Sequence, residues 1–374
     1  MSELAVSSVS FAQVAGNAQM GGTSRAIFFR REDLPQDKKQ WESIFLGCIG
    51  SPDPYGRQLD GMGGGISSLS KVCVVGPSTR PDADVDYTFV ALGVRDAEVD
   101  YSSNCGNMST AVGPFAVDSG MLDNVPSSGV HESITVRIHN TNTGKLIHAS
   151  FPVVDGEAAA SGEFAMDGVA GTAARVRLDF VEPGGSRTGN LLPTGNVIDE
   201  VSGIQATLLD AGNPCCFVRS ADLGIVNGRL SPQEIENRPE LTERLDEIRR
   251  QAGVMMGLAS SPEEVPGSVP KIAMISPSNE ASGRSVVVRA MSVGQPHRAI
   301  PVTVALATAA AAKLPGTTVH ACVSGRPAAD EELNIQHAGG QLLVDARYDD
   351  AGHLVLATVF RSARRLMDGL IYWK

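Results

Sequence analysis

Hydrophobic positions in the first half of the chain fall in short runs separated by turn residues. Apolar and β-branched residues dominate Ala26–Phe29, Lys71–Val75, Tyr87–Leu92 and Ile134–Ile138. Runs of this length, bounded by Gly, Pro, Asn and Ser, are typical of strands. The pattern therefore predicts a first half that is rich in short strands.

Two helical patterns interrupt these strands. One lies between Asp33 and Cys48, with Leu34-Pro35 near its start, and the other is the run of small apolar residues from Ser109 to Asp118. A helix that is apolar on all sides suits the interior of a domain. We therefore expect an α+β fold in which strands wrap around one central helix.

The second half repeats this plan faintly. Ala15-Gly16-Asn17 recurs as Ala211-Gly212-Asn213, an offset of 196 residues (211 − 15). The polar entry to a small-residue helix at Cys105 has a counterpart at His297, an offset of 192 residues (297 − 105). Two landmarks with nearly one spacing indicate an internal duplication. A chain of 374 residues also exceeds what one hydrophobic core usually covers, so two domains are expected.

A charged segment from Ser231 to Ala259 interrupts the second half. Ser231-Pro232-Gln233-Glu234 is a capping box with proline at the first helical position. Leu241, Leu245 and Ile248 mark one apolar face, and Asp246 and Arg250 can pair on the other. This segment is predicted to be a structural helix that leads, through a linker, to a strand at Lys271–Ile275.

Composition and charge narrow the classes of partner. The chain has 40 Gly and 21 Pro and a formal net charge of −11. This acidic balance argues against broad binding to nucleic acid or to anionic membranes. A small anionic ligand remains compatible with it, because such a ligand needs only a local pocket of donors.

The cysteines and the N-terminal segment bear on the compartment. The six cysteines have irregular spacings, which favours reduced thiols over a disulfide framework. The first residues lack the basic and apolar regions of a signal peptide, and no apolar run reaches the ~18 residues of a membrane span. We expect a soluble, cytoplasmic protein, and for such a protein a homodimer is the base-rate expectation.

Cys105 is the first candidate for chemistry. It stands in Asn104-Cys105-Gly106-Asn107, immediately before the predicted central helix. The first turn of a helix offers unpaired N–H groups and a positive dipole end, so a thiol there ionises more easily and an anion can bind beside it. The alternative is a buried cysteine that serves only as a small hydrophobic residue.

The second candidate for chemistry is Lys71, the last residue of a glycine-rich segment at 51–71. The segment has no apolar periodicity that packing would explain, and it matches neither the dinucleotide fingerprint nor the phosphate-binding P-loop. Loops of this length are often functional. The segment ends on Lys71, at the start of an apolar strand, where burial can favour the neutral amine and make it a general base. A solvated lysine at a strand end is the alternative.

Weaker candidates complete the set. The turn Gly21-Gly22-Thr23-Ser24 could hold a carboxylate or be an ordinary turn, and His297 and His337 lie in loop-like contexts. The chain has no Cys-x-x-Cys, His-Glu-x-x-His or Gly-x-Ser-x-Gly pattern, and the adjacent pair Cys215-Cys216 is poorly placed for joint metal ligation. We therefore expect no metal site, and the family resemblance described next implies that no cofactor is needed.

Together these segments resemble the PrpF family of cofactor-independent allylic isomerases, which includes methylaconitate, methylitaconate and 4-oxalomesaconate Δ-isomerases. The resemblance extends over nearly the whole chain. It is carried by these segments: Gly21–Ser24, Gly50–Gly61 through Ser70-Lys71-Val72, Asn104–Asn107, Asp210–Pro214, Met291-Ser292 with His297-Arg298-Ala299, and Arg361–Gly369.

The resemblance implies a diaminopimelate epimerase-like fold. That fold has two similar domains, each a β-barrel-like sheet around a central helix, with the active site in the interdomain cleft. We expect an N-terminal domain at residues 1–195, a C-terminal domain at 196–363, and a tail, 364–374, that returns to the first domain.

The resemblance also assigns roles. The family's catalytic Lys and Cys fall on Lys71 and Cys105, which we expect to share the acid and base roles in moving a double bond of an unsaturated di- or tricarboxylate. Backbone N–H groups around the glycine-rich loop and the helix start would stabilise the enolate-like intermediate. The expected substrate-binding residues are Gly21, Gly22, Thr23, Ser24, Gly64, Gly65, Ser67, Gly106, Asn107, Ser292, His297 and His337.

Two departures from the family pattern weaken the identification of the substrate. Met20 replaces the usual Arg before Gly21, and His337 is followed by Ala338-Gly339-Gly340 in place of a Pro-Ser-Gly sequence. A different or less charged substrate, or a carboxylate held by Arg25, would fit these changes. Two other functions stay open: a racemase or epimerase of the same fold, and a non-catalytic protein that binds carboxylates.

Overall fold

Two compact units make up the described part of the chain. The computed structural model describes the backbone of residues 6–15 and residues 24–101, 105–123, 125–126, 132–167, 171–226, 228–279, 283–292, 294–325 and 332–373. Unit 1 holds the described residues up to Leu178 and from Arg361 onward, and unit 2 holds those from Asp179 to Phe360. The domain limits expected from the sequence, with a boundary at 195, stay a prediction, since compactness alone does not test independent folding.

Unit 1 is built on a mixed sheet. β2 pairs antiparallel with β1 and parallel with β3, β3 pairs antiparallel with β4, β4 parallel with β6, and β6 antiparallel with β7. The strands of this unit are β1 (Val6–Ala15), β2 (Ser24–Arg30), β3 (Lys71–Pro77), β4 (Val85–Leu92), β5 (Val99–Asp100), β6 (Glu132–Asn140), β7 (Lys145–Val154), β8 (Glu157–Ala158), β9 (Phe164–Ala165) and β10 (Thr172–Ala173).

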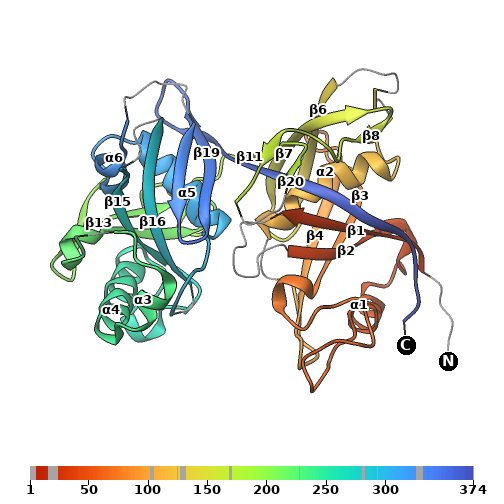
Figure 1. Cartoon of the computed structure of the whole chain (residues 1–374), viewed down its shortest axis with the longest axis horizontal. Helices are drawn as coiled ribbons and strands as arrows, with labels where there is room; N and C mark the ends of the chain where they lie inside the picture. The colour runs from red at the N-terminus through yellow and green to blue at the C-terminus, as the bar shows by residue number, and fades with distance from the viewer. Residues whose placement is uncertain are drawn as a thin grey trace. The chain divides into compact units, whose positions relative to one another are not determined.

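A buried helix lies against this sheet. α2 (Gly106–Asp118), labelled in Figure 1, contacts β1 to β4 and β6 to β8. Most of its side chains are buried. Its Phe115 ring lies 5.2 Å from that of Phe28 on β2. The central helix expected at Ser109–Asp118 is confirmed, and it begins three residues earlier, directly after Cys105.

The other helix predicted in the first half is shorter than expected. Only α1 (Trp41–Ile49) is α-helical, and the residues before it form 3₁₀ turns at Arg31–Asp33 and Lys38–Gln40. Pro35 explains the difference, because proline has no N–H to donate and disfavours helical geometry in the residue before it.

Unit 2 has the same order of pairings around a different helix. β14 pairs antiparallel with β13 and parallel with β15, β15 antiparallel with β16, β16 parallel with β18, and β18 antiparallel with β19. The alanine-rich α5 (Val302–Lys313) lies inside this arrangement, as Figure 1 shows. The strands are β12 (Asp199–Val201), β13 (Ile204–Asp210), β14 (Pro214–Arg219), β15 (Lys271–Pro277), β16 (Arg284–Ser292), β17 (Gln295–Pro296), β18 (Leu333–His337) and β19 (Gly340–Tyr348).

Two strands contain residues of both units. β11 (Val176–Val181) and β20 (Leu354–Ile371) each cross the division between units, at Leu178/Asp179 and Phe360/Arg361. The last part of β20 pairs antiparallel with β1, with Ser362 opposite Ala15.

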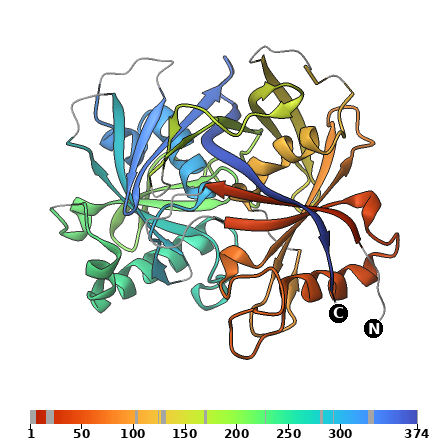
Figure 2. The same cartoon turned by 45° about the vertical axis from the view of Figure 1, so that its right-hand side comes forward.

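The charged insertion of unit 2 is helical, as predicted. Figure 2 shows its helices, in green, packed beside the strands of the unit. It forms α3 (Pro232–Glu236), which carries the predicted capping box, and α4 (Pro239–Met255). Leu241, Leu245 and Ile248 are buried, and Arg250 Nε donates to Asp246 at 2.6 Å. Pro239 divides the single helix expected here into two.

The short α6 (Thr318–Cys322) follows α5. Within the described ranges, no helix is both long and apolar enough to cross a bilayer.

Candidate functional site

Three side chains of unit 1 meet at one point. Lys71 Nζ donates to Cys105 Sγ at 3.3 Å and to Ser24 Oγ at 3.0 Å. The two residues that the sequence nominated for catalysis are thus in direct contact. Ser24, expected only to bind substrate, also bonds directly to the lysine.

Sheet geometry explains why Ser24 and Lys71 meet. Each is the first residue of its strand, and β2 and β3 run parallel with Ile27 opposite Val72. Because parallel strands start at the same edge of a sheet, the two side chains lie side by side there. The Phe89 ring of β4, 5.9 Å from Lys71 Nζ, flanks the ammonium on its apolar side.

The start of α2 presents the thiol. Cys105 is the N-cap residue, with extended φ and ψ of −107° and 100°, and its carbonyl accepts the first helical bond from Ser109 N at 3.0 Å. Its side chain does not cap the helix, so Sγ is directed to Lys71. The thiol is half-buried and not in a disulfide. The first-turn N–H groups of Gly106 and Asn107 precede the first residue able to bond within the helix.

A second thiol near this site has a packing role. Cys73, two residues along β3 from Lys71, is buried and contacts Tyr87 Oη at 3.9 Å. Burial raises the pKa of both Cys73 and Tyr87 well above the ordinary value. Both groups therefore remain protonated and neutral, and they form an uncharged wall beside the reactive pair.

Gln58 organises the glycine-rich loop that precedes Lys71. Its side chain is buried, accepts from Gly65 N at 2.8 Å and Ser70 Oγ at 2.9 Å, and donates to Ser51 Oγ at 2.8 Å. A Cβ on Gly63 would collide with this amide, so a glycine is required there. The amide ties both ends of the loop together immediately before Lys71.

Two residues that were expected to hold a substrate carboxylate also have partners within the loop, and their role in binding stays a prediction. Gly65 N–H was expected to hold a substrate carboxylate, but it is already bonded to Gln58. Arg25, the alternative carboxylate holder, donates through Nη2 to the carbonyls of Met62 and Gly63 at 3.1 and 3.4 Å. Both residues therefore shape the loop.

Comparison with known proteins identifies the family. The family described as "PrpF protein" matches residues 13–374. The chain belongs to the PrpF family. The resemblance inferred from its motifs is confirmed.

Relatives of this PrpF chain are isomerases. It is 39% identical over 370 residues to the 3-methylitaconate isomerase of Eubacterium barkeri, with 94% of each chain covered. It is 38% identical over 352 residues to the (4E)-oxalomesaconate Delta-isomerase of Novosphingobium sp. strain KA1, covering 94% of this chain and 95% of the relative.

Solved structures support the mixed α+β fold. A crystal structure of methylitaconate-delta-isomerase superposes with a TM-score of 0.88 at 35% identity, covering 99% of this chain and 96% of the other. A hydroxyproline epimerase from Agrobacterium vitis has a TM-score of 0.51 at 14% identity, over 100% of this chain and 94% of its own, and this likeness concerns the fold alone.

The remaining predicted site residues divide into three groups. Gly64 and Ser67 lie on the exposed part of the loop, and Asn107 Nδ2 donates to Ser24 Oγ at 3.4 Å. His297 and His337 belong to unit 2, where their Nδ1 atoms accept from Ala299 N and Gly339 N at 3.1 Å. Ser292 ends β16 of the same unit. Outside the described residues lie Met20, Gly21, Gly22, Thr23 and Asn104.

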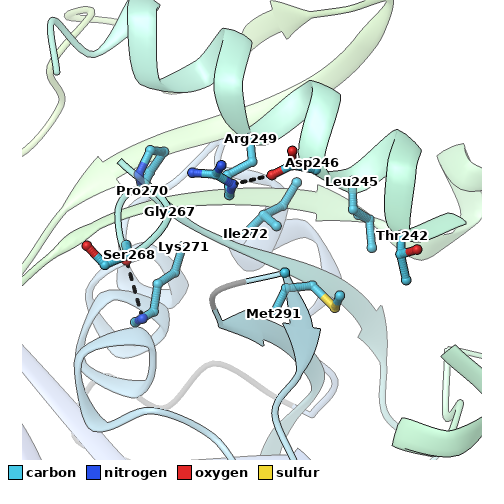
Figure 3. A pocket seen from close by; sticks show the side chains of 11 residues that line it. Thr242, Leu245, Asp246, Arg249, Gly267, Ser268, Pro270, Lys271, Ile272 and Met291 are labelled. Carbon is cyan, nitrogen blue, oxygen red and sulfur yellow. Dashed lines mark hydrogen bonds and ion pairs between the residues drawn. The ribbon is translucent and has the colours of Figure 1, made fainter. Parts of the chain in front are cut away.

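Unit 2 has its own lysine at the equivalent strand start. Lys271 begins β15, and its Nζ donates to the Ser268 carbonyl at 3.4 Å (Figure 3). The cavity beside it has a volume of only about 10 Å³, room for about one water molecule. Arg249 and Asp246 of α4 form an ion pair along its wall. Lys271 is also paired in register with Cys215 on β14, whose thiol is buried. This PrpF chain therefore has one strand-start lysine hydrogen-bonded to a half-buried thiol, and one hydrogen-bonded to a backbone carbonyl beside a buried thiol.

No metal centre accompanies these residues. Among the described residues, no group of three or more His, Cys, Asp or Glu side chains could hold a metal ion. At the described site, Lys71 and Cys105 bring together an amine and a thiol, two groups that can carry protons.

Proposed function

We propose that this PrpF protein is an allylic isomerase that moves a carbon–carbon double bond of an unsaturated di- or tricarboxylate by a 1,3-proton shift. The direct contact of Lys71 with Cys105, at 3.3 Å, is the observation that carries the proposal. The relatives support the substrate class, since their names refer to methylitaconate, methylaconitate and oxalomesaconate.

The reaction uses the two groups in turn. One of Lys71 and Cys105, in its basic form, removes a proton from the saturated carbon next to the double bond. The electron pair moves into the conjugated carboxylate and forms an enolate-like dianion. A proton is then returned to the carbon two positions away, and the double bond settles in its new position.

The contact between the groups resets the pair. When one of them has taken a proton and the other has given one, a single transfer across 3.3 Å restores the starting forms. The substrate accepts and returns its own electron pair, so no external electron acceptor is required. The order in which Lys71 and Cys105 act is left open in this proposal.

The intermediate needs positive charge aimed at its carboxylate. The N-terminus of α2 supplies it, because the N–H groups of Gly106 and Asn107 point out of the first turn and the helix dipole is positive there. No acidic residue lies in that first turn. We include Ser292, His297 and His337 of unit 2 among the residues proposed to bind the substrate.

Isotope exchange tests the proposal. The protein is incubated in D₂O with methylaconitate, methylitaconate, aconitate, mesaconate and 4-oxalomesaconate, and deuterium uptake and double-bond position are followed by proton NMR. We expect migration of the double bond with deuterium at the carbon that receives the proton. Exchange at one carbon without migration would indicate an epimerase, and binding without exchange would indicate a carboxylate-binding protein.

A further inference from the structure

Arg361 is a buried cation, and two of its three nitrogens have no hydrogen-bond partner among the described residues. It lies on β20 in unit 1, is 1% exposed, and is among the largest fully buried side chains. No hydrogen bond reaches its Nε or Nη1 from the described residues. Burial lowers the pKa of Arg361 to about 10, so the guanidinium is charged at neutral pH.

The other three buried arginines in the described part of the chain all donate to backbone carbonyls, among them Arg284, whose Nη2 donates to the Ala312 carbonyl at 3.3 Å. Arg289 donates to the carbonyls of Leu230, Val288 and Gln336 at 2.6–3.1 Å. Arg249 pairs with Asp246 and donates to a carbonyl. A buried guanidinium without such bonds costs several kcal/mol. Folding alone therefore does not account for Arg361.

The charge of Arg361 acts on the proposed site. The neighbour of Arg361 on β20, Ser362, pairs with Ala15 on β1, and the adjacent Val14 pairs with Ser24 on β2. Cys105 raises the pKa of Arg361 and so opposes the effect of burial. Asn107, two residues further along α2, also has an unsatisfied buried atom, Oδ1. Its Nδ2 bonds Ser24. Whichever way this amide is oriented, one polar atom bonds Ser24 and the other is left for a ligand.

We propose that Arg361 binds a carboxylate of the substrate, and so sets the specificity of the site for polycarboxylates over monocarboxylates. The inference rests on the proposed function and adds a residue that the motif-based prediction did not assign. A carboxylate supplies the missing acceptors, and a charge-assisted bond at a desolvated site is stronger than one between neutral groups. The guanidinium and the first turn of α2 then attract two separate carboxylates of one ligand.

In the absence of ligand, the buried charge of Arg361 makes the protein less stable than an apolar residue at that position would. An apolar side chain of similar size at position 361 would remove an uncompensated charge, and such replacements are often neutral or stabilising. A purely structural arginine behaves in the opposite way, because its removal leaves carbonyls without donors. Replacing Arg361 by an apolar residue should therefore weaken ligand binding without lowering the stability of the unliganded protein. This combination is expected only if Arg361 binds a ligand.

Tricarballylate, a saturated tricarboxylate that cannot isomerise, is the probe. Wild type, Arg361→Met, Arg361→Lys and the control Arg289→Met are compared by isothermal titration calorimetry and by thermal unfolding. We expect Arg361→Met to bind at least about 30-fold more weakly, the loss typical of removing one partner of a buried charge pair. Its unfolding temperature without ligand should equal or exceed that of wild type. Arg361→Lys should retain part of the affinity.

The control separates a binding role from a folding role. Arg289→Met should unfold at a lower temperature and still bind tricarballylate within about threefold of wild type, because its donors serve carbonyls of unit 2. Wild-type affinity in Arg361→Met would overturn the inference. If Arg361→Met does not fold, Arg361→Gln replaces it, and equal affinity of the Gln and Lys variants would overturn the inference as well.

Measuring double-bond migration together with tricarballylate binding separates a failure of this inference from a failure of the proposed function. If the wild type binds tricarballylate through Arg361 but isomerises none of the unsaturated acids, the proposed function fails and the carboxylate site stands. If it isomerises an acid but does not bind tricarballylate, the KM for that acid becomes the readout. Unchanged KM in Arg361→Met would then sink the inference and leave the proposed function intact.

Discussion

Lys71 and Lys271 occupy the same position in two similar sheets and have different surroundings. Each is the first residue of a strand that pairs parallel with one neighbour and antiparallel with the next. Each strand has one half-buried residue, five buried residues and one exposed residue in the same order. Yet Lys71 bonds a thiol and a hydroxyl, whereas Lys271 bonds a carbonyl.

The residue at the start of the central helix accounts for the difference. α2 begins after Cys105, whose thiol extends toward Lys71, whereas α5 begins after Pro301, whose ring carries no polar atom. The insertion α3–α4 also closes the surroundings of Lys271, since Arg249 and Asp246 line its small cavity. In unit 1 the lysine thus contacts a half-buried thiol at the adjoining helix start, whereas the thiol paired in register with Lys271, that of Cys215, is buried in the sheet.

The sharpest test of this contrast removes each lysine in turn. Lys71→Ala and Cys105→Ser should each lower kcat by about 10²–10⁴-fold, the usual contribution of a positioned acid or base. Lys271→Ala should change kcat less than about threefold. Initial rates of double-bond migration measure all three, and circular dichroism checks the fold. Comparable losses in Lys71→Ala and Lys271→Ala would contradict the contrast.

Loss of the hydroxyl beside Lys71 should have the next largest effect. Ser24→Ala removes an acceptor of the ammonium and of Asn107 Nδ2, so the amine loses one of its two positioning bonds. We expect kcat to fall by about 10-fold, on the scale of one lost hydrogen bond to a charged group. Ser43→Ala is the matched control, because Ser43 is exposed on α1. An unchanged kcat in Ser24→Ala would leave Cys105 as the sole positioning partner.

Gln58→Ala should act mainly on stability. The variant leaves Ser51, Gly65 and Ser70 without their shared partner in a buried setting. We expect a loss of about 2–3 kcal/mol in the free energy of unfolding, measured by urea denaturation. Gln205→Ala, at an exposed position of unit 2, should stay within about 0.5 kcal/mol. If both variants lose equally little, the loop does not depend on Gln58.

The smallest effect is expected far from either lysine. Ser231→Ala breaks the capping box of α3, in which Ser231 and Glu234 bond reciprocally. The expected cost is about 1 kcal/mol of unfolding free energy, with kcat unchanged. A fall in kcat beyond twofold would show that the insertion takes part in the reaction.

Local patterns were sufficient to predict the parts of the fold that depend on neighbouring residues. The strands at Lys71 and Tyr87, the small-residue helix after Cys105 and the capping box at Ser231 all follow from short-range spacing. The family motif singled out Lys71 and Cys105, although 34 residues separate them. Their direct contact depends on how β3 and α2 pack, which no local pattern contains.

Local sequence patterns could not predict the roles of Gln58 and Arg361. Gln58 stands among polar and glycine residues typical of an exposed loop, and only the folded loop shows that its amide is buried. Arg361 lies 256 residues after Cys105 (361 − 105), as the first residue of the motif Arg361–Gly369, to which the resemblance assigned no role in the site. Its significance comes from two buried nitrogens that have no hydrogen-bond acceptor among the described residues, which the sequence alone does not show.

The place of Arg361 in the chain has a consequence for motion. A single peptide bond joins it to Phe360, the last residue of unit 2, within one continuous strand, β20. A ligand held by Arg361 restrains the backbone where the polypeptide passes from one unit into the other. Amide hydrogen exchange along β20 should therefore slow when a tricarboxylate binds. We expect this slowing in the residues of β20 that belong to unit 1 and in those that belong to unit 2.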